Sequence, residues 1–550
     1  MTPNSSEGTP KFSSDSERHG LLGRIIENWL TSANERQYQL PFCQVLAAEG
    51  ETILYVSTHG PFEKGKDIVT RTATGGIRAY QLKAGNIGLG EWRVIYGEIV
   101  NLVELAIELP GIPPITEFVP FLVTNGELSD PVIEQVRVAN VTWQSRGVNK
   151  ALRTIQKGDL SDRFRASHSA YLPRELRDFR TFLELILRDG AAPPEKEKAA
   201  QLIEHVLPPR PGQEDPLNVA RAAASVVLLV AYITGSAVSA SNHWCVFEYW
   251  VLAAAYILFL IERSRKAEAR CQVSFEICET AAEGELSALA EECRRRSDLV
   301  QGNPLVDGHT YRPRVTLLIG LLSAWDLSLR IRRRPRNNAD FVRSFLDAHL
   351  KEASMWGESA VPYLFLAAVE AEQNCEPQVA EGMVIQLVRE ISAANGASAT
   401  GRGLCNPYYP PEEALRLLYG LDPLNPEQFV GDTYSIASLI DFLARRWRRQ
   451  ALAALWFGLT RMSFVEYVPA SFSEWFRWRS SEGTLSCSLP GEPQSWEALR
   501  THAETISLDG LPPTLVKHSA FAPWFILVYP HRFTPAIAKL IEDAVWESMV

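Results

Sequence analysis

The spacing of hydrophobic positions changes along the chain, and each change marks a predicted element. From Leu21 to Gly50 apolar side chains recur every three or four residues, which is the spacing of two amphipathic helices. Gly50 stands where a helix C-cap would, so we expect the second helix to end there. Residues 1–18 are polar, rich in Ser and Pro and without the apolar segment of a secretory signal, which predicts a disordered tail.

Three runs rich in β-branched and aromatic residues follow, and they predict a group of strands. The runs span residues 52–58, 67–72 and 77–84. Gly75 and Gly76 stand between the last two runs, where a Gly-Gly pair favours a tight hairpin. We therefore expect the second strand to fold back along the third.

The chain then returns to helical spacing at 90–109, continues with an apolar strand at 118–124, and has helical spacing again at 130–143. The order helix, three strands, helix, strand, helix describes a small α/β domain that ends near residue 150. Counting its flanks, we assign residues 19–160 to this domain.

Beyond this domain the spacing is helical almost throughout. Proline-rich stretches at 191–198 and 207–216 interrupt it as linkers, and 161–216 is expected to be a helical linker region. Residues 217–400 are predicted to form an α-helical domain and 401–550 a C-terminal, mainly helical region, whose organisation after residue 463 the pattern leaves open. The helical runs are 217–235, 247–268, 274–296, 314–331, 339–352, 361–371, 377–394, 411–419 and 434–458.

Two apolar stretches in the helical part raise the question of a membrane. Residues 222–241 carry no charge, and residues 249–261 are also apolar. Ser, Thr and Gly dilute the first stretch, and the second is shorter than a membrane span. Buried helices of an all-α domain are thus favoured over a membrane hairpin, and no membrane is expected as a partner.

Composition and charge narrow the class of protein further. The 550 residues are 46% hydrophobic and 22% charged, as in a globular protein of two or three domains. The formal net charge of −10 argues against a protein that coats nucleic acid by bulk electrostatics, so any such contact must be local. The eight cysteines lack the spacing of a zinc site, which fits reduced thiols in the cytoplasm.

The candidate chemistry lies on the predicted hairpin. Gln81 and Lys83 are two residues apart on one strand, so their side chains share a face, while Leu82 turns to the other. The hairpin folds Asp67 back opposite this pair, and Glu63 in the preceding turn can add a second carboxylate. Carboxylate and amide oxygens beside an ammonium group suit Mg²⁺ or Mn²⁺ and phosphodiester hydrolysis.

Each of these residues receives a role in that hypothesis. Asp67 would be the central metal ligand, and the side chain of Gln81 and the backbone carbonyl of Leu82 would complete the coordination. Glu63 would hold a metal-bound water or a second ion. Lys83 would polarise the attacking nucleophile and neutralise developing charge.

Residues 40–145 resemble the Mrr-like branch of the restriction-endonuclease-like, PD-(D/E)XK, superfamily. The matching segments are FCQVLAAEG as the helix, EKGKD (63–67) as the acidic glycine turn, QLK (81–83) as the catalytic strand, and PFLVTNGELSD as the last element. Two positions depart from the branch pattern. Glu63 replaces the first aspartate, and Gln81 stands where an acid usually binds the metal, a substitution common in this branch.

The resemblance implies an N-terminal restriction-endonuclease-like α/β core followed by a large, mainly α-helical region. It also implies a metal-dependent endonuclease that cleaves DNA, with its helical part sensing a trigger, forming a homo-oligomer or restraining cleavage. A role in bacterial defence against phage or foreign DNA follows by analogy. The alternatives are an inactive nuclease fold that binds nucleic acid or acts as a scaffold, and a structure-specific repair nuclease or RNase.

Further candidates carry more ordinary interpretations. His59 and Glu98 are possible accessory residues of the metal site, although a structural turn and a solvated helix face are the favoured readings. Basic runs stand out at 294–296 and 330–336, where helix faces that balance neighbouring acids are again favoured. The best candidate for nucleic-acid contact has an aromatic residue inside a basic run and comprises Arg445, Arg446, Trp447, Arg448 and Arg449.

Overall fold

The structure is a computed structural model, and its contacts divide the chain into two units. Unit 1 comprises residues 1–179 and 220–232, and unit 2 comprises residues 180–219 and 233–550. The structure describes Leu30 and residues 33–57, 65–109, 112–168, 176–208, 216–296, 308–374, 376–395, 403–418, 431–480, 482–488 and 495–548.

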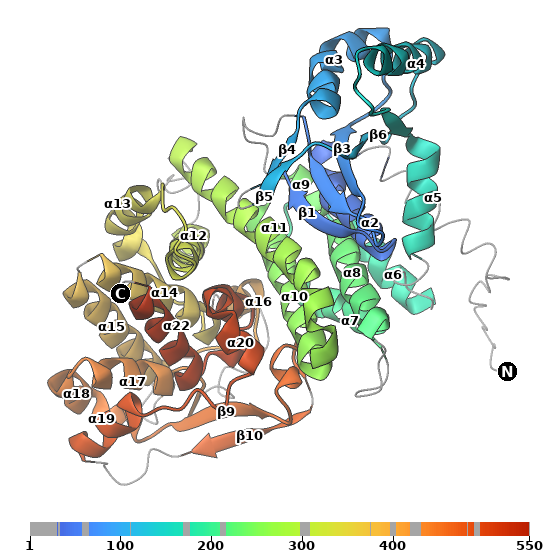
Figure 1. The fold of residues 1–550 in the computed structure, drawn as a ribbon. Helices are drawn as coiled ribbons and strands as arrows, with labels where there is room; N and C mark the ends of the chain where they lie inside the picture. The colour runs from blue at the N-terminus through green and yellow to red at the C-terminus, as the bar shows by residue number, and fades with distance from the viewer. Residues whose placement is uncertain are drawn as a thin grey trace, which may run out of the picture. The chain divides into compact units, whose positions relative to one another are not determined.

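A five-stranded mixed sheet forms the centre of unit 1 (Figure 1). The strand order is β1-β2-β3-β6-β7. The first three strands are antiparallel neighbours, whereas β3 pairs with β6, and β6 with β7, in parallel. The strands are β1 (Thr52–Val56), β2 (Ile68–Arg71), β3 (Ile77–Lys83), β6 (Val119–Thr124) and β7 (Arg153–Ile155).

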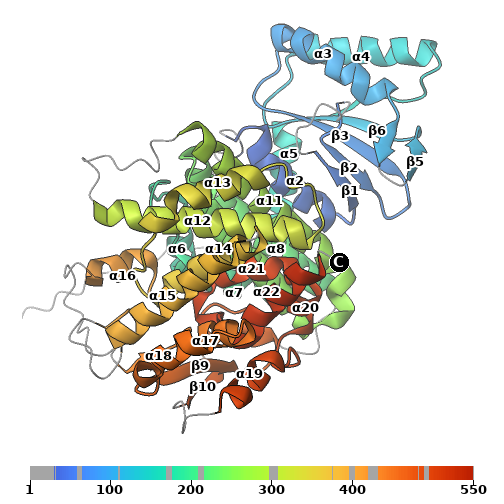
Figure 2. The ribbon, with the colours of Figure 1, turned by 90° about the vertical axis from the view of Figure 1, so that its left-hand side faces the viewer.

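Helices cover both faces of this sheet, with α3 and α4 on one face and α2 with α5 on the other (Figure 2). Because parallel neighbours need a crossover connection, α3 lies between β3 and β6 in the chain. The bounds are α2 (Glu35–Ala48), α3 (Leu89–Glu104), α4 (Asp130–Ser145) and α5 (Lys157–His168).

Alternating residues of the strands supply the two apolar layers. On the α3 and α4 face, Val69, Ala79 and Leu122 belong to a hydrophobic cluster with residues of both helices. On the α2 face, the Tyr80 ring lies 5.0 Å from that of Phe121, centroid to centroid. A sheet that is buried on both sides gives its few polar positions fixed surroundings.

The predicted order of helix, three strands, helix, strand, helix is confirmed, with a few different boundaries. The helix expected at 90–109 ends earlier, because Leu105 adopts an extended conformation, and β4 (Ile107–Leu109) then pairs with β5 (Ile112–Ile115). The sheet also continues past residue 150 with β7. The helix expected before Leu30 and the tail at 1–18 lie outside the described residues.

The hairpin between β2 and β3 turns at residues 72–76. Gly75 has a φ of +87°, a left-handed conformation that favours glycine. The Thr72 amide donates to the Gly76 carbonyl at 2.8 Å, and the Gly75 amide donates to the Thr72 carbonyl at 2.9 Å. The Gly-Gly turn that the sequence predicts is thus present, and it establishes the pairing of Arg71 with Ile77.

Asn125, at the end of β6, connects three segments of unit 1. Its side-chain amide donates to the carbonyls of Leu30, at 2.5 Å, and Ala33, at 2.7 Å. Its amide oxygen accepts from the Gly85 amide at 2.7 Å. The next residue, Gly126, packs so closely that a Cβ atom there would lie 2.2 Å from the Gly85 carbonyl carbon.

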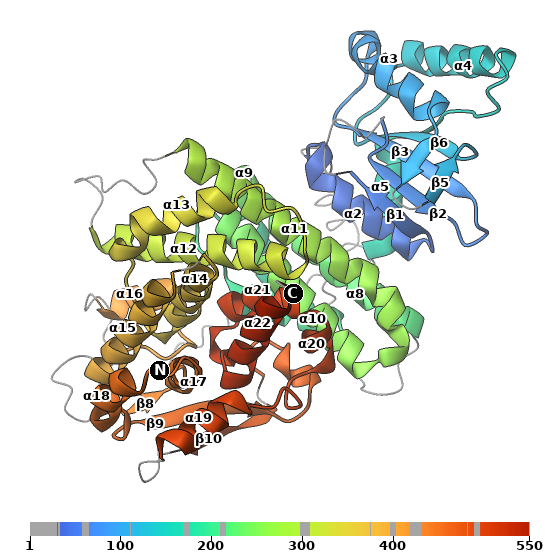
Figure 3. The same cartoon turned by 60° about the vertical axis from the view of Figure 1, so that its left-hand side comes forward.

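Unit 2 is mainly helical, as predicted. Its helices α12, α14 and α15 pack in succession, and α10 pairs with α11 (Figure 3). The main helices are α10 (His243–Arg263), α11 (Glu268–Arg295), α12 (Gly308–Ile331), α14 (Val361–Gln373), α15 (Pro377–Asn395), α17 (Ile436–Arg445), α18 (Arg449–Leu459), α21 (Ala522–Val528) and α22 (Pro535–Glu547). Its shorter helices are α7 (Lys196–Val206), α9 (Gly235–Ser239), α13 (Ala339–His349), α16 (Pro411–Leu418), α19 (Trp496–Glu504) and α20 (Pro513–Lys517). Helices α6 (Leu176–Ile186) and α8 (Pro216–Ile233) are divided between the units, and most of α8 belongs to unit 1.

A three-stranded sheet interrupts the helical pattern near the C-terminus, the region where the sequence left the organisation open. It has the order β10-β9-β8 and contains β8 (Asp432–Thr433), β9 (Ser463–Pro469) and β10 (Gly483–Ser488). The helical run expected at 434–458 is two helices, α17 and α18, separated at Trp447 by its φ of +61°.

Residues 196–198, expected in a linker, instead begin α7. Lys196 is buried, and its ammonium group lies 2.8 Å from a carboxylate oxygen of Glu248 in α10. It also donates to the Val528 carbonyl at 3.3 Å. A buried charge is stable only with such partners, so this segment is part of the core of unit 2.

Among the described helices, α10 alone is long and apolar enough to cross a membrane. Of its most apolar window, 94% is buried inside the structure. The core helix of a folded protein passes the same test of length and composition.

Replacing Asn125 by alanine should destabilise unit 1 by about 2–4 kcal/mol, because three backbone groups, two of them in buried hydrogen bonds, lose their partner. Hydrogen–deuterium exchange of the full chain should show faster exchange of the β3 and β6 amides. Thr142→Ala, which changes a partly exposed residue of α4, is the matched control and should leave the protection free energy of these amides within about 0.5 kcal/mol of the parent. Equal protection in both variants would contradict the role of Asn125.

Candidate functional site

Asp67 is anchored to β3 at the open end of the hairpin. The last pair in the register is Ile68 with Tyr80, so Asp67 lies opposite Gln81. The Asp67 amide donates to the Tyr80 carbonyl at 2.8 Å, and the Leu82 amide donates to Oδ2 of Asp67 at 2.6 Å. Because Asp67 is only 6% exposed, this hydrogen bond offsets part of the cost of burying its carboxylate.

Gln81 and Lys83 share one face of β3, the face that α3 covers. The Lys83 ammonium lies 2.7 Å from Oε2 of Glu98 in α3, and the Gln81 side-chain amide donates to the same oxygen at 3.4 Å. The structure thus brings Asp67, Gln81, Lys83 and Glu98 together. Glu98, for which a solvated face was favoured, is half-exposed but takes part in the site.

The carbonyl oxygen of the Gln81 side chain is buried and has no hydrogen-bond partner among the described residues. It faces Gly65, where a Cβ atom would lie 3.3 Å from this oxygen and 2.6 Å from the Glu98 carbonyl oxygen. Gly65 also has a φ of +73°, so a side chain there is excluded twice. Rotating the Gln81 amide by half a turn would not give this oxygen a donor, because it would place the oxygen beside the carboxylate of Glu98.

Helix α2 supplies three further residues that the sequence analysis did not assign to the site. Oε1 of Glu35 lies 3.9 Å from the Lys83 ammonium, and the Tyr38 hydroxyl donates to the Lys83 carbonyl at 2.7 Å. Burial, together with the charge of Glu35, holds the pKa of Tyr38 well above its usual value. Gln39 donates to the Asp67 carbonyl at 3.3 Å. The sequence signal that could have identified these residues is the set of polar side chains at positions i, i+3 and i+4 of a largely buried helix.

The oxygen donors of this site are of the kind that Mg²⁺ and Mn²⁺ prefer. They comprise the carboxylates of Asp67 and Glu98 and the buried Gln81 oxygen, with the Leu82 carbonyl on the same strand. Within the described residues no group of three or more His, Cys, Asp or Glu side chains is arranged to hold a metal ion. The predicted second carboxylate, Glu63, and the accessory His59 lie outside the described residues.

Two arginines of the basic run in unit 2 form internal salt bridges. Arg445 and Arg446 both pair with Glu542, and Arg446 also pairs with Glu372. All four side chains are largely buried. These arginines could contact phosphate only by breaking buried ion pairs, which is costly, so the structure argues against the predicted nucleic-acid contact through them.

The rest of this run is more exposed. Arg448 pairs with Glu381, while Trp447 is 63% exposed and lies beneath the guanidinium of Arg500, 4.0 Å from the ring centroid. Arg449 is exposed at the start of α18. Most arginines of this run thus balance neighbouring acidic side chains, which is the alternative interpretation of the sequence.

Comparison with known proteins adds no identification. No protein-family model matches the chain, and no curated protein or solved structure matches it significantly. The functional argument therefore depends on the residues and their geometry.

Replacing Gln81 by glutamate should strengthen binding of Mn²⁺ by about tenfold or more, or ~1.4 kcal/mol, because a third carboxylate joins Asp67 and Glu98. Without metal the added buried charge beside Glu98 should lower the melting temperature. Titration calorimetry with Mn²⁺ and thermal unfolding with and without the ion measure both effects. Gln144→Glu, on the exposed face of α4, is the control, and equal changes in both variants would refute a metal site at residue 81.

Proposed function

We propose that unit 1 is a metal-dependent nuclease domain of the PD-(D/E)XK type, which hydrolyses phosphodiester bonds of DNA. One observation carries this proposal. The register of the β2–β3 hairpin places Asp67 against Gln81, with Lys83 two residues further along the same strand face and Glu98 beside both. Oxygen donors next to an ammonium group are the combination that phosphodiester hydrolysis needs.

The arrangement of the sheet also supports this proposal. An antiparallel meander leads into the QLK strand, and a helix then crosses to a parallel strand that ends in Thr124 and Asn125. This is the order of helix, strands and final element that the resemblance to the Mrr-like branch implies over residues 40–145. The resemblance and the geometry therefore point to the same three residues, Asp67, Gln81 and Lys83, to which the geometry adds Glu98.

The side chains of this site divide the work of hydrolysis. A Mg²⁺ or Mn²⁺ ion held by Asp67 and the Gln81 oxygen would polarise the scissile phosphate. Lys83 orients the attacking water and neutralises the charge that develops on the phosphate oxygens. Glu98 positions the Lys83 ammonium through their 2.7 Å contact, and Asp67 is held in place by the Leu82 amide. Glu63 would add a carboxylate from the preceding turn.

Unit 2 would then regulate cleavage, as a sensor, an oligomerisation region or a restraint. We place this activity in the cytoplasm, with DNA as the substrate and defence against phage or foreign DNA as its setting. The regulatory role follows from the size of the helical unit, and the defence role from the family resemblance alone.

A second candidate function is a nuclease fold that binds nucleic acid without cutting it. Two observations favour it. Gln81 stands where an acid usually binds the metal, and the Lys83 ammonium already pairs with Glu98. In this case the site would keep its shape but lack the charge needed to hold a metal ion.

Lys83→Ala should lower cleavage of plasmid DNA in Mg²⁺ or Mn²⁺ by roughly 100- to 1,000-fold. The variant lacks the ammonium group that would neutralise the negative charge developing on the phosphate oxygens. Lys83→Arg should retain more activity than Lys83→Ala, since it keeps the positive charge. Arg146→Ala removes an exposed cation at the end of α4 and serves as the control. Gel assays of plasmid cleavage, with melting temperatures for each variant, measure the effect.

The same assay separates the alternatives. Cleavage by the parent chain that Lys83→Ala abolishes supports the nuclease, and equal cleavage by both proteins would overturn the assignment of Lys83. DNA binding without cleavage in either ion would favour the inactive fold. Branched DNA, single strands and RNA, offered as substrates, distinguish a repair nuclease or an RNase from a DNA endonuclease.

A further inference from the structure

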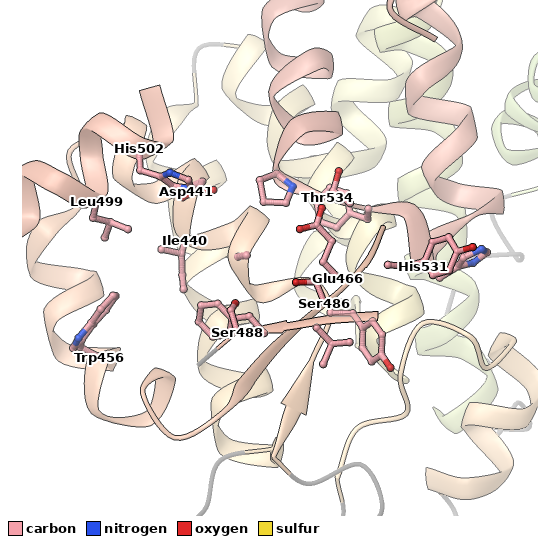
Figure 4. A pocket seen from close by; sticks show the side chains of 17 residues that line it. Ile440, Asp441, Trp456, Glu466, Ser486, Ser488, Leu499, His502, His531 and Thr534 are labelled. Atoms are coloured by element: carbon pink, nitrogen blue, oxygen red, sulfur yellow. The ribbon is translucent and has the colours of Figure 1, made fainter. Parts of the chain in front are cut away.

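Unit 2 contains an open cavity of about 320 Å³ that the sequence analysis did not anticipate (Figure 4). Its walls come from α17, α18, α19 and strands β9 and β10, together with the segment that precedes α22. Pockets that bind small molecules usually measure about 300–1,000 Å³, so this cavity has room for a compact ligand.

Much of the cavity wall is aromatic. The rings of Tyr434, Trp456, Phe464, Tyr467 and Phe533 line it. Aromatic faces carry a negative electrostatic potential and attract both planar rings and cations. The lining thus favours a flat or positively charged ligand.

Asp441 is the unusual polar residue of this wall. It is only 4% exposed, and none of the described residues forms a hydrogen bond or a salt bridge with its carboxyl group. The nearest balancing charge, Arg445, bonds to Glu542 and to the Ala503 carbonyl. Burying a carboxylate without a hydrogen-bond donor lowers the stability of the fold by roughly several kcal/mol. A ligand that brings N–H donors would remove that cost.

A second carboxylate, that of Glu466 on β9, lies across the cavity. Figure 4 shows Asp441 and His502 on one side and Glu466 with Thr534 on the other. Glu466 is exposed on β9, and partial desolvation by the surrounding protein raises its pKa. Two acids therefore face the same space from opposite walls.

The charge balance of the cavity is negative. Against Asp441 and Glu466 stand Arg445, which is already paired, and His502, which is exposed like Glu466. His531 contributes no positive charge, because complete burial holds its pKa well below the usual value. An anionic ligand would meet two carboxylates here, whereas a cation would be attracted.

From the unpaired Asp441, the opposing Glu466 and the aromatic walls, we infer that this cavity binds a small organic cation that joins an aromatic ring to a protonated alkylamine or amidine. The ammonium group donates to Asp441, Glu466 adds negative charge from the opposite wall, and the ring stacks on the aromatic side chains. This inference concerns unit 2 alone and stands apart from the proposed nuclease.

Tryptamine, phenethylamine and benzamidine are suitable probes for titration calorimetry with the full chain. We expect at least one to bind, and indole-3-propionate, which carries an indole ring like tryptamine but the opposite charge, to bind at least 10-fold more weakly. Asp441→Asn should weaken the binding of that cation at least 10-fold, and Glu466→Gln several-fold. Asp509→Asn removes an exposed carboxylate of the same unit and should leave the affinity unchanged.

Leu499→Trp, which fills the cavity without changing its charge, provides a second test if a charge variant folds poorly. It should abolish binding of the same probe. Binding by none of the three cations would overturn the inference, as would tighter binding of indole-3-propionate. Binding that survives both Asp441→Asn and Leu499→Trp would place the ligand elsewhere and would overturn it too.

The stability of the free protein should also depend on Asp441 and pH. Burial raises its pKa to about 6, opposed by Arg445 and His502 and aided by Glu542. Because this pKa lies above that of an unfolded aspartate, the folded state binds more protons, and its stability falls as pH rises to about 6. Asp441→Asn should therefore raise the melting temperature more at pH 7.5 than at pH 5. An increase at pH 5 as large as that at pH 7.5 would contradict this explanation.

Discussion

The hydrogen bond from the Leu82 amide to the Asp67 carboxylate is the interaction on which the candidate site of unit 1 depends. It gives a nearly buried carboxylate a donor, and it does so only in the observed register of β2 and β3. A shift of one residue would turn Gln81 and Lys83 to the opposite face of the sheet. The register of one hairpin therefore decides whether an acid, an amide and an ammonium group meet.

A polar cluster on the opposite face holds the same hairpin in place. Glu51, which lies between α2 and β1, accepts hydrogen bonds from Thr70 of β2 and from Arg78 and Tyr80 of β3. Such a network, buried and shared between two strands, stabilises one pairing over its neighbours. The site residues thus occupy a strand whose two faces are both constrained, one by Glu51 and one by Glu98.

In unit 2, by contrast, most buried charges have internal partners. Arg336 bridges Asp326 and Glu370, and Arg446 bridges Glu372 and Glu542. These networks account for the basic runs without invoking a phosphate ligand. Asp441 departs from this pattern, because its carboxyl group faces a cavity and has no such partner among the described residues. The cavity is therefore distinguished from the rest of unit 2 by a buried acid that can accept hydrogen bonds from a ligand.

Local periodicity in the sequence predicted β1, β2, β3 and β6 of unit 1 and the Gly-Gly hairpin. The alignment of Asp67 with Gln81 and Lys83 follows from that hairpin, since it depends on residues close together in the chain. Most helices of unit 2 were predictable for the same reason. Only the tertiary structure decided that Glu98 and α2 join the site, that the basic run is internally paired, and that Asp441 and Glu466 share a cavity. Those outcomes depend on contacts between distant segments, whose burial and charge no local pattern records.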